Sequence, residues 1–259
     1  MSSELLVVGH ELRCGYDAES VVLDGVDIRI ERGEVVTILG GSGSGKSTLL
    51  KTLGGLLPPL AGTVELFGED LYAVDDARRA ELLQRTGTLF QHDALFGSMT
   101  LRGNVALPVE QLTDLPDEIA DRLADTKLDL VELAHLAERF PSQVSGGQRK
   151  RAALARAVVL DPEIVWCDEP TSGLDPITAA RLDHSLLHLR DVFGLTIVAV
   201  THDVESVRTI ADRAIVVGCG AILAEGTVTE LEQSELAGVA EFFHRVELER
   251  TSWQPEHRT

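Results

Sequence analysis

The most informative segment of this chain is Gly40-Gly41-Ser42-Gly43-Ser44-Gly45-Lys46-Ser47. It fits the pattern GxxxxGK[ST], follows the apolar segment Val35–Leu39 directly, and leads directly into a predicted helix. Glycines let successive backbone N–H groups turn inward, and the helix N-terminus adds a partial positive charge. We therefore predict a loop that binds the phosphates of a nucleoside triphosphate. Lys46 would reach the β- and γ-phosphates, and the Ser47 hydroxyl would ligate Mg²⁺.

An apolar strand that ends in two carboxylates supplies the second half of the predicted site. Ile164–Cys167 is followed by Asp168 and Glu169, and α/β sheets bind their ligands at the C-terminal edge of the strands. Asp168 is expected to hold Mg²⁺, directly or through water. Because adjacent strand residues point to opposite sides, Glu169 is expected to polarise the attacking water. The alternative is a solvated strand end.

A histidine follows the next apolar strand in the same way. His202 comes shortly after Thr196–Val200. A histidine at this place can be an ordinary packing residue, or it can sense the γ-phosphate if the strand runs parallel to its neighbours. The spacing alone leaves both interpretations open.

Composition and charge limit the classes of function. The chain has 259 residues, 44% of them hydrophobic and 25% charged, which is typical of a globular protein. It carries 23 Lys and Arg against 42 Asp and Glu, a formal net charge of −19. Such acidity argues against a general nucleic-acid binder and against direct docking on an anionic membrane. The uncharged stretches fall short of the roughly 18 to 20 residues that span a bilayer. The N-terminus has no positive region ahead of an apolar run, so we expect no secretory signal.

The cysteine spacing and the order of the predicted elements indicate the type of cysteine and the fold class. Cys14, Cys167 and Cys219 form no metal-ligand spacing and are expected to be mostly buried in a reduced cytosol. The predicted strands are Val21–Leu23, Val26–Ile30, Val35–Leu39, Thr63–Phe67, Thr86–Phe90, Ile164–Cys167, Thr196–Val200, Ala214–Val217 and Ala221–Ala224. The predicted helices are Lys46–Leu57, Asp75–Arg85, Gln148–Leu160, Thr178–Val192 and Val204–Ala211, with a mainly helical insert from Thr100 to Val144. This alternation indicates an α/β fold with a mostly parallel sheet covered on both faces.

One further motif points to a family. Val144-Ser145-Gly146-Gly147-Gln148 precedes a predicted helix, where Ser145 can cap the helix and the glycines expose its first N–H groups to an anion. This stretch resembles the LSGGQ signature of ABC ATPases, with Val144 in place of leucine. The family's other motifs follow the same order along the chain. Tyr16 matches the aromatic residue that stacks on adenine, and Gln91 matches the glutamine that couples nucleotide to the helical insert.

The resemblance extends to the remaining motifs. Ser172-Gly173-Leu174-Asp175 is similar to the D-loop, although Gly173 stands where alanine is more usual, and His202 matches the switch histidine. The resemblance implies an ATPase that uses ATP and Mg²⁺. The catalytic residues would be Lys46, Gln91, Glu169 and His202, and the Mg²⁺ ligands Ser47, Gln91 and Asp168. The nucleotide would be bound by Tyr16, Gly40, Gly41, Ser42, Gly43, Ser44, Gly45, Lys46, Ser47, Thr48, Ser145, Gly146, Gly147, Gln148 and Asp175.

The resemblance covers about Leu5 to Val246 and implies a domain plan. Residues 1–246 would form one ABC ATPase domain, with a P-loop NTPase core, an N-terminal antiparallel β part, and a helical subdomain at about 92–150. Residues 247–259 form a polar tail that either embraces a neighbouring subunit or is a loose end. Two copies would pack head to tail, with each ATP between the phosphate loop of one and the signature of the other.

A finer resemblance concerns lipid transport. The segments Leu89–Met99, Asn104–Pro108, Asp175–Thr178 and Val239–Phe243 resemble the ATPases of the Mla and Mce lipid-transport systems. This implies a homodimer that is cytoplasmic and peripheral on the inner face of the cell membrane. Its partners would be permease subunits, a Mce-type lipid-binding protein and a small accessory subunit, with no nucleic acid. Amino-acid or metal importers and lipoprotein exporters remain alternatives.

Other features have competing interpretations. Arg149–Arg151 can be a nucleic-acid contact or, as we expect, a solvated face near the nucleotide and the dimer interface. His184 and His188 have a spacing that can bind metal, but no third ligand accompanies them, so we expect surface residues. A soluble ABC protein acting on nucleic acid is disfavoured by the acidity. A GTPase is disfavoured by the absence of NKxD.

Overall fold

The computed structural model describes residues 4–236, 238–239 and 242–243. A four-stranded antiparallel sheet has the order β2 (Val21–Glu31), β1 (Leu5–Gly15), β4 (Ala61–Leu66), β5 (Glu69–Asp70). The two strands predicted between Val21 and Ile30 are one strand, β2. Gly25 lies in it with φ +68°, where the register against β1 shifts, so the strand bends at a bulge without ending. The two-residue strand β5 was not predicted.

The second sheet carries the phosphate loop. Its order is β10 (Ala221–Gly226), β9 (Arg213–Gly218), β3 (Val35–Leu39), β8 (Thr196–Val200), β7 (Ile164–Asp168), β6 (Thr86–Leu89). Only the β10–β9 pair of this sheet is antiparallel, which confirms the mostly parallel sheet. Every residue of β3, β7 and β8 is buried, because both faces of the sheet are covered.

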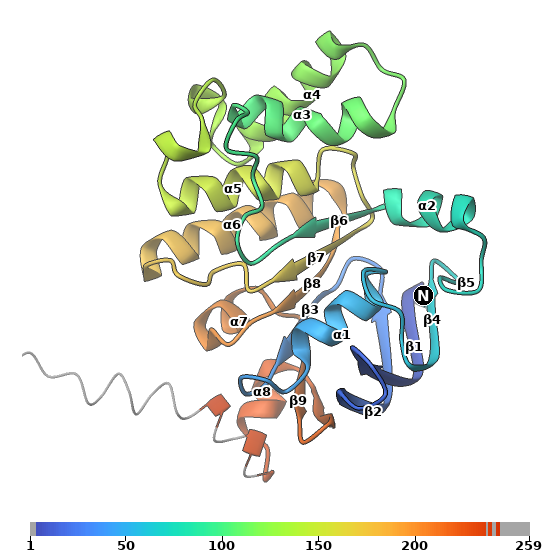
Figure 1. The fold of residues 1–259 in the computed structure, drawn as a ribbon. Coiled ribbons are helices and arrows are strands. Elements are labelled where there is room, and N and C mark those ends of the chain that lie inside the picture. The colour runs from blue at the N-terminus through green and yellow to red at the C-terminus, as the bar shows by residue number, and fades with distance from the viewer. Residues whose placement is uncertain (1–3, 237, 240–241, 244–259) are drawn as a thin grey trace, which may run out of the picture.

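The two faces have separate hydrophobic cores. On one face, Val165 and Ile197 pack with helices α5 (Gly146–Ala157) and α6 (Pro176–Phe193). On the other, Trp166 and Val198 pack with α1 (Lys46–Leu53) and the antiparallel sheet. Alternate residues of β7 and β8 thus serve opposite cores, as the pleat of a strand requires. Figure 1 shows α1 between the two sheets and α5 and α6 on the opposite side.

The predicted helical insert is present as α3 (Leu101–Leu112), α4 (Asp117–Leu130) and two short 3₁₀ turns, Ala134–Leu136 and Pro141–Gln143. Figure 1 shows α3 and α4 beyond α5, at the end of the molecule away from β1 and β2. The remaining helices are α2 (Asp76–Gln84), α7 (Val204–Ile210) and α8 (Val228–Glu232). The helix α8 was not predicted. In the part of the chain that the structure describes, no helix is both long and apolar enough to cross a membrane.

Several predicted boundaries shift for local reasons. Helix α1 ends at Leu53, four residues before the predicted Leu57, because the glycine pair that follows includes Gly55 at φ +78°. Helix α6 begins at Pro176 because Asp175 caps it and proline suits the first helical position. Helix α5 begins at Gly146 and ends at Ala157, and β7 includes Asp168. The predicted polar tail 247–259 lies outside the described residues.

The cysteines are mostly buried, as predicted, and Cys219 is the exception. Cys14 and Cys167 are buried, and burial raises the pKa of both thiols. Cys219 is exposed because it lies in the tight turn between β9 and β10, with φ +50°. In such a surface turn between adjacent strands, the Cys219 side chain faces solvent.

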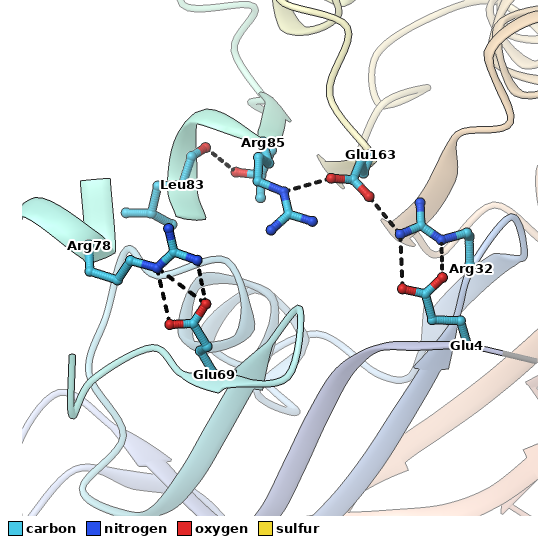
Figure 2. Close-up of polar contacts among 8 residues, drawn as sticks. Glu4, Arg32, Glu69, Arg78, Leu83, Arg85 and Glu163 are labelled. Atoms are coloured by element: carbon cyan, nitrogen blue, oxygen red, sulfur yellow. Dashed lines mark hydrogen bonds and ion pairs between the residues drawn. The ribbon is translucent and has the colours of Figure 1, made fainter. Parts of the chain in front are cut away.

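An ion network ties the antiparallel sheet to the other elements (Figure 2). Arg32 Nε lies 2.8 Å from Glu4 Oε2, and its Nη2 lies 2.7 Å from Glu163 Oε2. Arg85 Nε lies 2.6 Å from the other oxygen of Glu163. Glu163 immediately precedes β7, so the network lies at the N-terminal end of that strand. The predicted nucleotide site is at the opposite, C-terminal end of β7. We therefore interpret the ion network as a structural contact that holds the two sheets together.

Candidate nucleotide-binding site

The predicted phosphate loop joins β3 to α1 and has a backbone that requires glycine. Gly40 has φ +151° and Gly45 has φ +99°. A Cβ on Gly40 would overlap the carbonyl oxygen of Val217 on the neighbouring strand β9. In contrast, nothing lies within 4 Å of a Cβ built on Gly41 or Gly43. The loop is therefore closed toward the sheet and open on its outer side, where a phosphate can approach.

Two polar groups of the loop suit an anion. Ser44 Oγ is buried and has no hydrogen-bond partner among the described residues. Lys46 is 8% exposed, and its Nζ donates to the carbonyl oxygens of Gly40 at 3.0 Å and Gly41 at 2.8 Å. Burial lowers the pKa of Lys46, an effect that the charges of Glu169 and Asp168 oppose. The ammonium group is thus held at the mouth of the loop.

The two halves of the predicted metal site meet. Ser47 Oγ donates to Asp168 Oδ1 at 2.8 Å, which joins the start of α1 to the end of β7. A hydroxyl and a carboxylate oxygen are ligands that Mg²⁺ prefers. Gln91 follows β6, which neighbours β7, and its side chain is exposed. These residues fit a Mg²⁺ ion, although the part played by Gln91 stays a prediction.

Glu169 and His202 also come together. His202 Nδ1 lies 2.9 Å from Oε1 and 2.8 Å from Oε2 of Glu169. The predicted reason for the direction of Glu169 is wrong, because β7 ends at Asp168 and strand alternation no longer applies. Glu169 instead has φ +49°, while its N–H donates to the carbonyl of Val200 on β8. Such a left-handed conformation is costly for a non-glycine residue and recurs at functional sites.

The predicted signature caps α5. Gln148 N donates to Ser145 Oγ at 3.3 Å, and Ser145 N donates to Gln148 Oε1 at 2.8 Å, which together form a capping box. Gly147 allows α6 to approach, because a Cβ there would overlap the side chain of Thr178. Within the described residues, no hydrogen bond or ion pair joins Ser145–Gln148 to the phosphate loop of the same chain.

The basic triplet after the signature is not a solvated face, and that prediction is wrong for two of its residues. Lys150 and Arg151 are buried, with side chains 5% and 11% exposed. Lys150 Nζ donates to the backbone carbonyl of Gln91 and lies 3.5 Å from Asp93 Oδ1. Arg151 Nη1 donates to the carbonyl of Val131 at 2.9 Å. Both buried cations are thus hydrogen-bonded to backbone carbonyls from outside α5.

Asp93 is a residue of this site that the sequence did not single out. It has φ +59°, and the next residue, Ala94, has φ +52°. Arg156 Nη2 donates to the carbonyl of Asp93 at 2.9 Å, and Arg156 Nη1 donates to that of Ala94 at 2.6 Å. Arg149 Nε lies 3.3 Å from Asp93 Oδ2. Cations of α5 therefore hold the segment directly after Gln91 in a strained conformation. The only sequence signal was the density of cations on α5.

The remaining predicted residues occupy the surface. Tyr16 is 64% exposed just beyond β1, so its ring is free to stack on a base. Asp175 accepts hydrogen bonds from the N–H groups of Ile177 and Thr178 and from Thr178 Oγ1, and these bonds lower its pKa. Gly173 has φ +76°, which explains glycine where the related motif usually has alanine. Contacts of Tyr16 and Asp175 with nucleotide stay predictions.

The histidine pair on α6 is confirmed at the surface. His184 and His188 are both exposed. Among the described residues, no group of three or more His, Cys, Asp or Glu side chains is arranged to hold a metal ion.

Comparisons with known proteins identify the family of this chain. Residues 23–172, more than half of the chain, match the family model described as ABC transporter. The chain is 38% identical over 224 residues to the intermembrane phospholipid transport system ATP-binding protein MlaF of Haemophilus influenzae, covering 86% of this chain and 85% of that protein. It is 42% identical over 221 residues to the methionine import ATP-binding protein MetN of Streptomyces griseus, covering 83% of this chain and 62% of MetN.

Solved structures have the same architecture. The dimeric ATP-binding cassette MJ0796, in a post-hydrolysis state bound to ADP and Pi, superposes with a TM-score of 0.78 at 32% identity, covering 86% of this chain and 99% of the other. CbiO1 from Clostridium perfringens, part of an ABC transporter complex, gives 0.82 at 28% identity, covering 96% and 97%. The chain thus belongs to the ABC transporter family, as an ATP-binding subunit with ATPase activity.

Proposed function

We propose that this ATPase powers a transporter of phospholipid or another lipid, of the Mla and Mce type. The observation that carries the proposal is the similarity to MlaF across 86% of the chain. It coincides with the Mla-like segments around Leu89–Met99 and Asn104–Pro108. The second candidate is methionine import, which the similarity to MetN at up to 42% identity favours. That similarity covers a smaller part of the MetN proteins, 58% and 62% in two cases.

Within the site, each residue has a proposed task. Lys46 binds the β- and γ-phosphates, while the open faces of Gly41 and Gly43 let backbone N–H groups approach them. Glu169 accepts the proton of the attacking water, and His202, at 2.9 Å, orients the carboxylate. Ser47, Asp168 and Gln91 would hold Mg²⁺, which neutralises phosphate charge when it is bound.

We propose that two copies complete each other's sites. Ser145–Gln148 presents the capped N-terminus of α5 but has no contact with the phosphate loop of its own chain in the described residues. A second copy, packed head to tail, would bring this helix end and Asp175 to the γ-phosphate. The dimeric cassettes among the structural neighbours support this arrangement. ATP binding would close the dimer and hydrolysis would release it, because the closing contacts exist only in the ATP-bound pair.

We propose that the membrane permease docks beside α3. A groove of about 450 Å³ lies there, lined by Phe90, Phe96, Pro108 and Leu112 among other residues. Phe96 is 52% exposed, and the loop that carries it follows Gln91, so a docked partner would lie close to the nucleotide. Permease contact would place the protein on the cytoplasmic face of the membrane. A Mce-type lipid-binding protein and a small accessory subunit are further proposed partners.

The test is reconstitution. The tagged full chain is purified from its native membranes together with its permease and placed in vesicles of phosphatidylethanolamine and phosphatidylglycerol. We expect labelled phospholipid to move between vesicles and an acceptor only with ATP. Stimulation of ATP turnover by methionine, with no ATP-dependent lipid movement, would overturn the lipid proposal in favour of the second candidate.

A further inference from the structure

A buried polar pair joins α6 to α7. Ser206 Oγ donates to Asp183 Oδ1 at 2.7 Å. Asp183 is 3% exposed and Ser206 is 2% exposed. A carboxylate so well shielded from water is costly unless a partner satisfies it. None of the tasks described above uses this pair.

The two helices that the pair joins both begin at the candidate site. Helix α6 starts after its cap, Asp175, which is the last residue of the predicted D-loop. Helix α7 starts at its cap, Asp203, the residue next to His202. The pair therefore links the helix behind the dimer-facing loop to the helix behind the histidine that contacts Glu169.

Ser206 is held at two points in the first turn of α7. Its backbone N–H donates to Asp203 Oδ1 at 3.3 Å, and its hydroxyl donates to Asp183. The N–H of Asp203 in turn donates to Thr201 Oγ1 at 3.0 Å. Hydrogen bonds thus connect residues within the segment Thr201–Ser206, which contains His202. The hydrogen bond from Ser206 to Asp183, which we call the tie, connects this segment to α6.

The charge of Asp183 changes near neutral pH. Burial raises the pKa of Asp183 to about 6, the hydrogen bond from Ser206 opposes this shift, and the negative charge of Asp203 adds to it. Asp203, on α7, is the charged neighbour that acts on this carboxyl across the helix contact. An ionised acceptor makes the stronger hydrogen bond, so the tie to Ser206 tightens as the proton leaves.

We propose that Asp183 is a positioning residue for ATP hydrolysis: its hydrogen bond to Ser206 fixes the first turn of α7 against α6 and so holds His202 at Glu169. The inference rests on the proposed roles of Glu169 and His202. In this proposal Asp183 contacts neither the nucleotide nor the attacking water, and it acts on His202 through α7.

The test compares Ser206→Ala and Asp183→Asn in the purified full chain. The matched controls are Ser185→Ala and Asp191→Asn, which lie on α6 outside the pair. Turnover and KM for ATP are measured from pH 5.5 to 8.5, together with thermal unfolding. Loss of one hydrogen bond in the tie predicts about a fivefold lower kcat for Ser206→Ala, with KM for ATP within about twofold of wild type.

The conservative variant Asp183→Asn tests the pH dependence of kcat. This dependence would not change if the Asp183–Ser206 pair had only a structural role. The amide of Asp183→Asn still accepts from Ser206 but cannot ionise. We expect its kcat to match wild type at pH 5.5. The ratio of wild-type to variant kcat should then rise through about pH 6, because only wild type gains the charge-assisted bond. Taking the ratio cancels other titrations that both proteins share.

The outcomes separate this inference from the proposed function. Glu169→Gln and His202→Ala are assayed in parallel. If either retains wild-type turnover, the proposed role of that residue fails. If both lose turnover while Ser206→Ala keeps wild-type kcat, or if the Asp183→Asn ratio is flat with pH, the positioning role of Asp183 is overturned.

Discussion

Replacing Asp183 with asparagine should change how the stability of this protein depends on pH. The folded carboxyl has its pKa raised from 3.8 to about 6, mainly by burial. The folded state therefore holds the proton more tightly than the unfolded state does. The corresponding stability is fully present below pH 3.8 and is lost as the pH rises through about 6.

The size of the effect follows from the shift. Roughly two pKa units correspond to about 3 kcal/mol, and the side chain is too well buried for solvent screening to reduce this figure much. The amide of Asp183→Asn cannot ionise, so it avoids this loss. The free energy of unfolding of the variant, minus that of wild type, should grow by about 2.4 kcal/mol between pH 4 and pH 7, which is most of the full effect.

The assay is urea unfolding at half-unit steps of pH. Asp191→Asn is the matched control, because Asp191 lies on the same helix with its side chain 65% exposed, and its difference from wild type should stay within about 0.5 kcal/mol. A difference for Asp183→Asn that is flat between pH 4 and pH 7 would refute the buried titration.

Three further changes test other parts of the structure. Lys150→Met should lower the free energy of unfolding by about 2 kcal/mol because it leaves the carbonyl of Gln91 unpaired, and Lys150→Arg should recover part of this loss. Equal urea midpoints for both variants and wild type would show that the hydrogen bond from Lys150 to Gln91 does not stabilise the fold. Gly40→Ala should reduce binding of a fluorescent ATP analogue at least tenfold because its Cβ meets the carbonyl of Val217, and unchanged binding would show that the loop can adapt. Phe96→Asp should abolish co-purification with the permease without changing basal ATP turnover, since Phe96 is exposed in the groove; retained co-purification would exclude that groove as the docking surface.

Much of the fold could be predicted from local sequence. Strand β8 occupies Thr196–Val200 as predicted, because a short apolar run between polar residues has few other solutions in an α/β chain. The phosphate loop could be predicted because Gly40 and Gly45 adopt backbone conformations that few other residues reach. In both cases the information lies within a few neighbouring residues.

The features that could not be predicted depend on distant partners. Lys150 is buried because the carbonyl of Gln91, 59 positions away in sequence, needs a donor. Its neighbours along the chain gave no sign of this. Asp183 and Ser206 lie on two different helices, and their hydrogen bond depends on how the fold packs α6 against α7. The predicted reason for the role of Glu169 is wrong, since the direction of its side chain comes from a left-handed backbone conformation and not from strand alternation.

In the proposed mechanism, ATP joins two copies of this chain and hydrolysis separates them. Glu169→Gln removes the proposed base while leaving the phosphate loop and the Ser47–Asp168 contact intact. The direct measurement is the mass of this variant by size exclusion with light scattering, with and without ATP and Mg²⁺, and with Lys46→Ala added as the control that lacks the phosphate cation. We expect a stable dimer for Glu169→Gln only with ATP, and a monomer for the double variant under every condition. A monomer of Glu169→Gln at saturating ATP would rule out the ATP-dependent dimer.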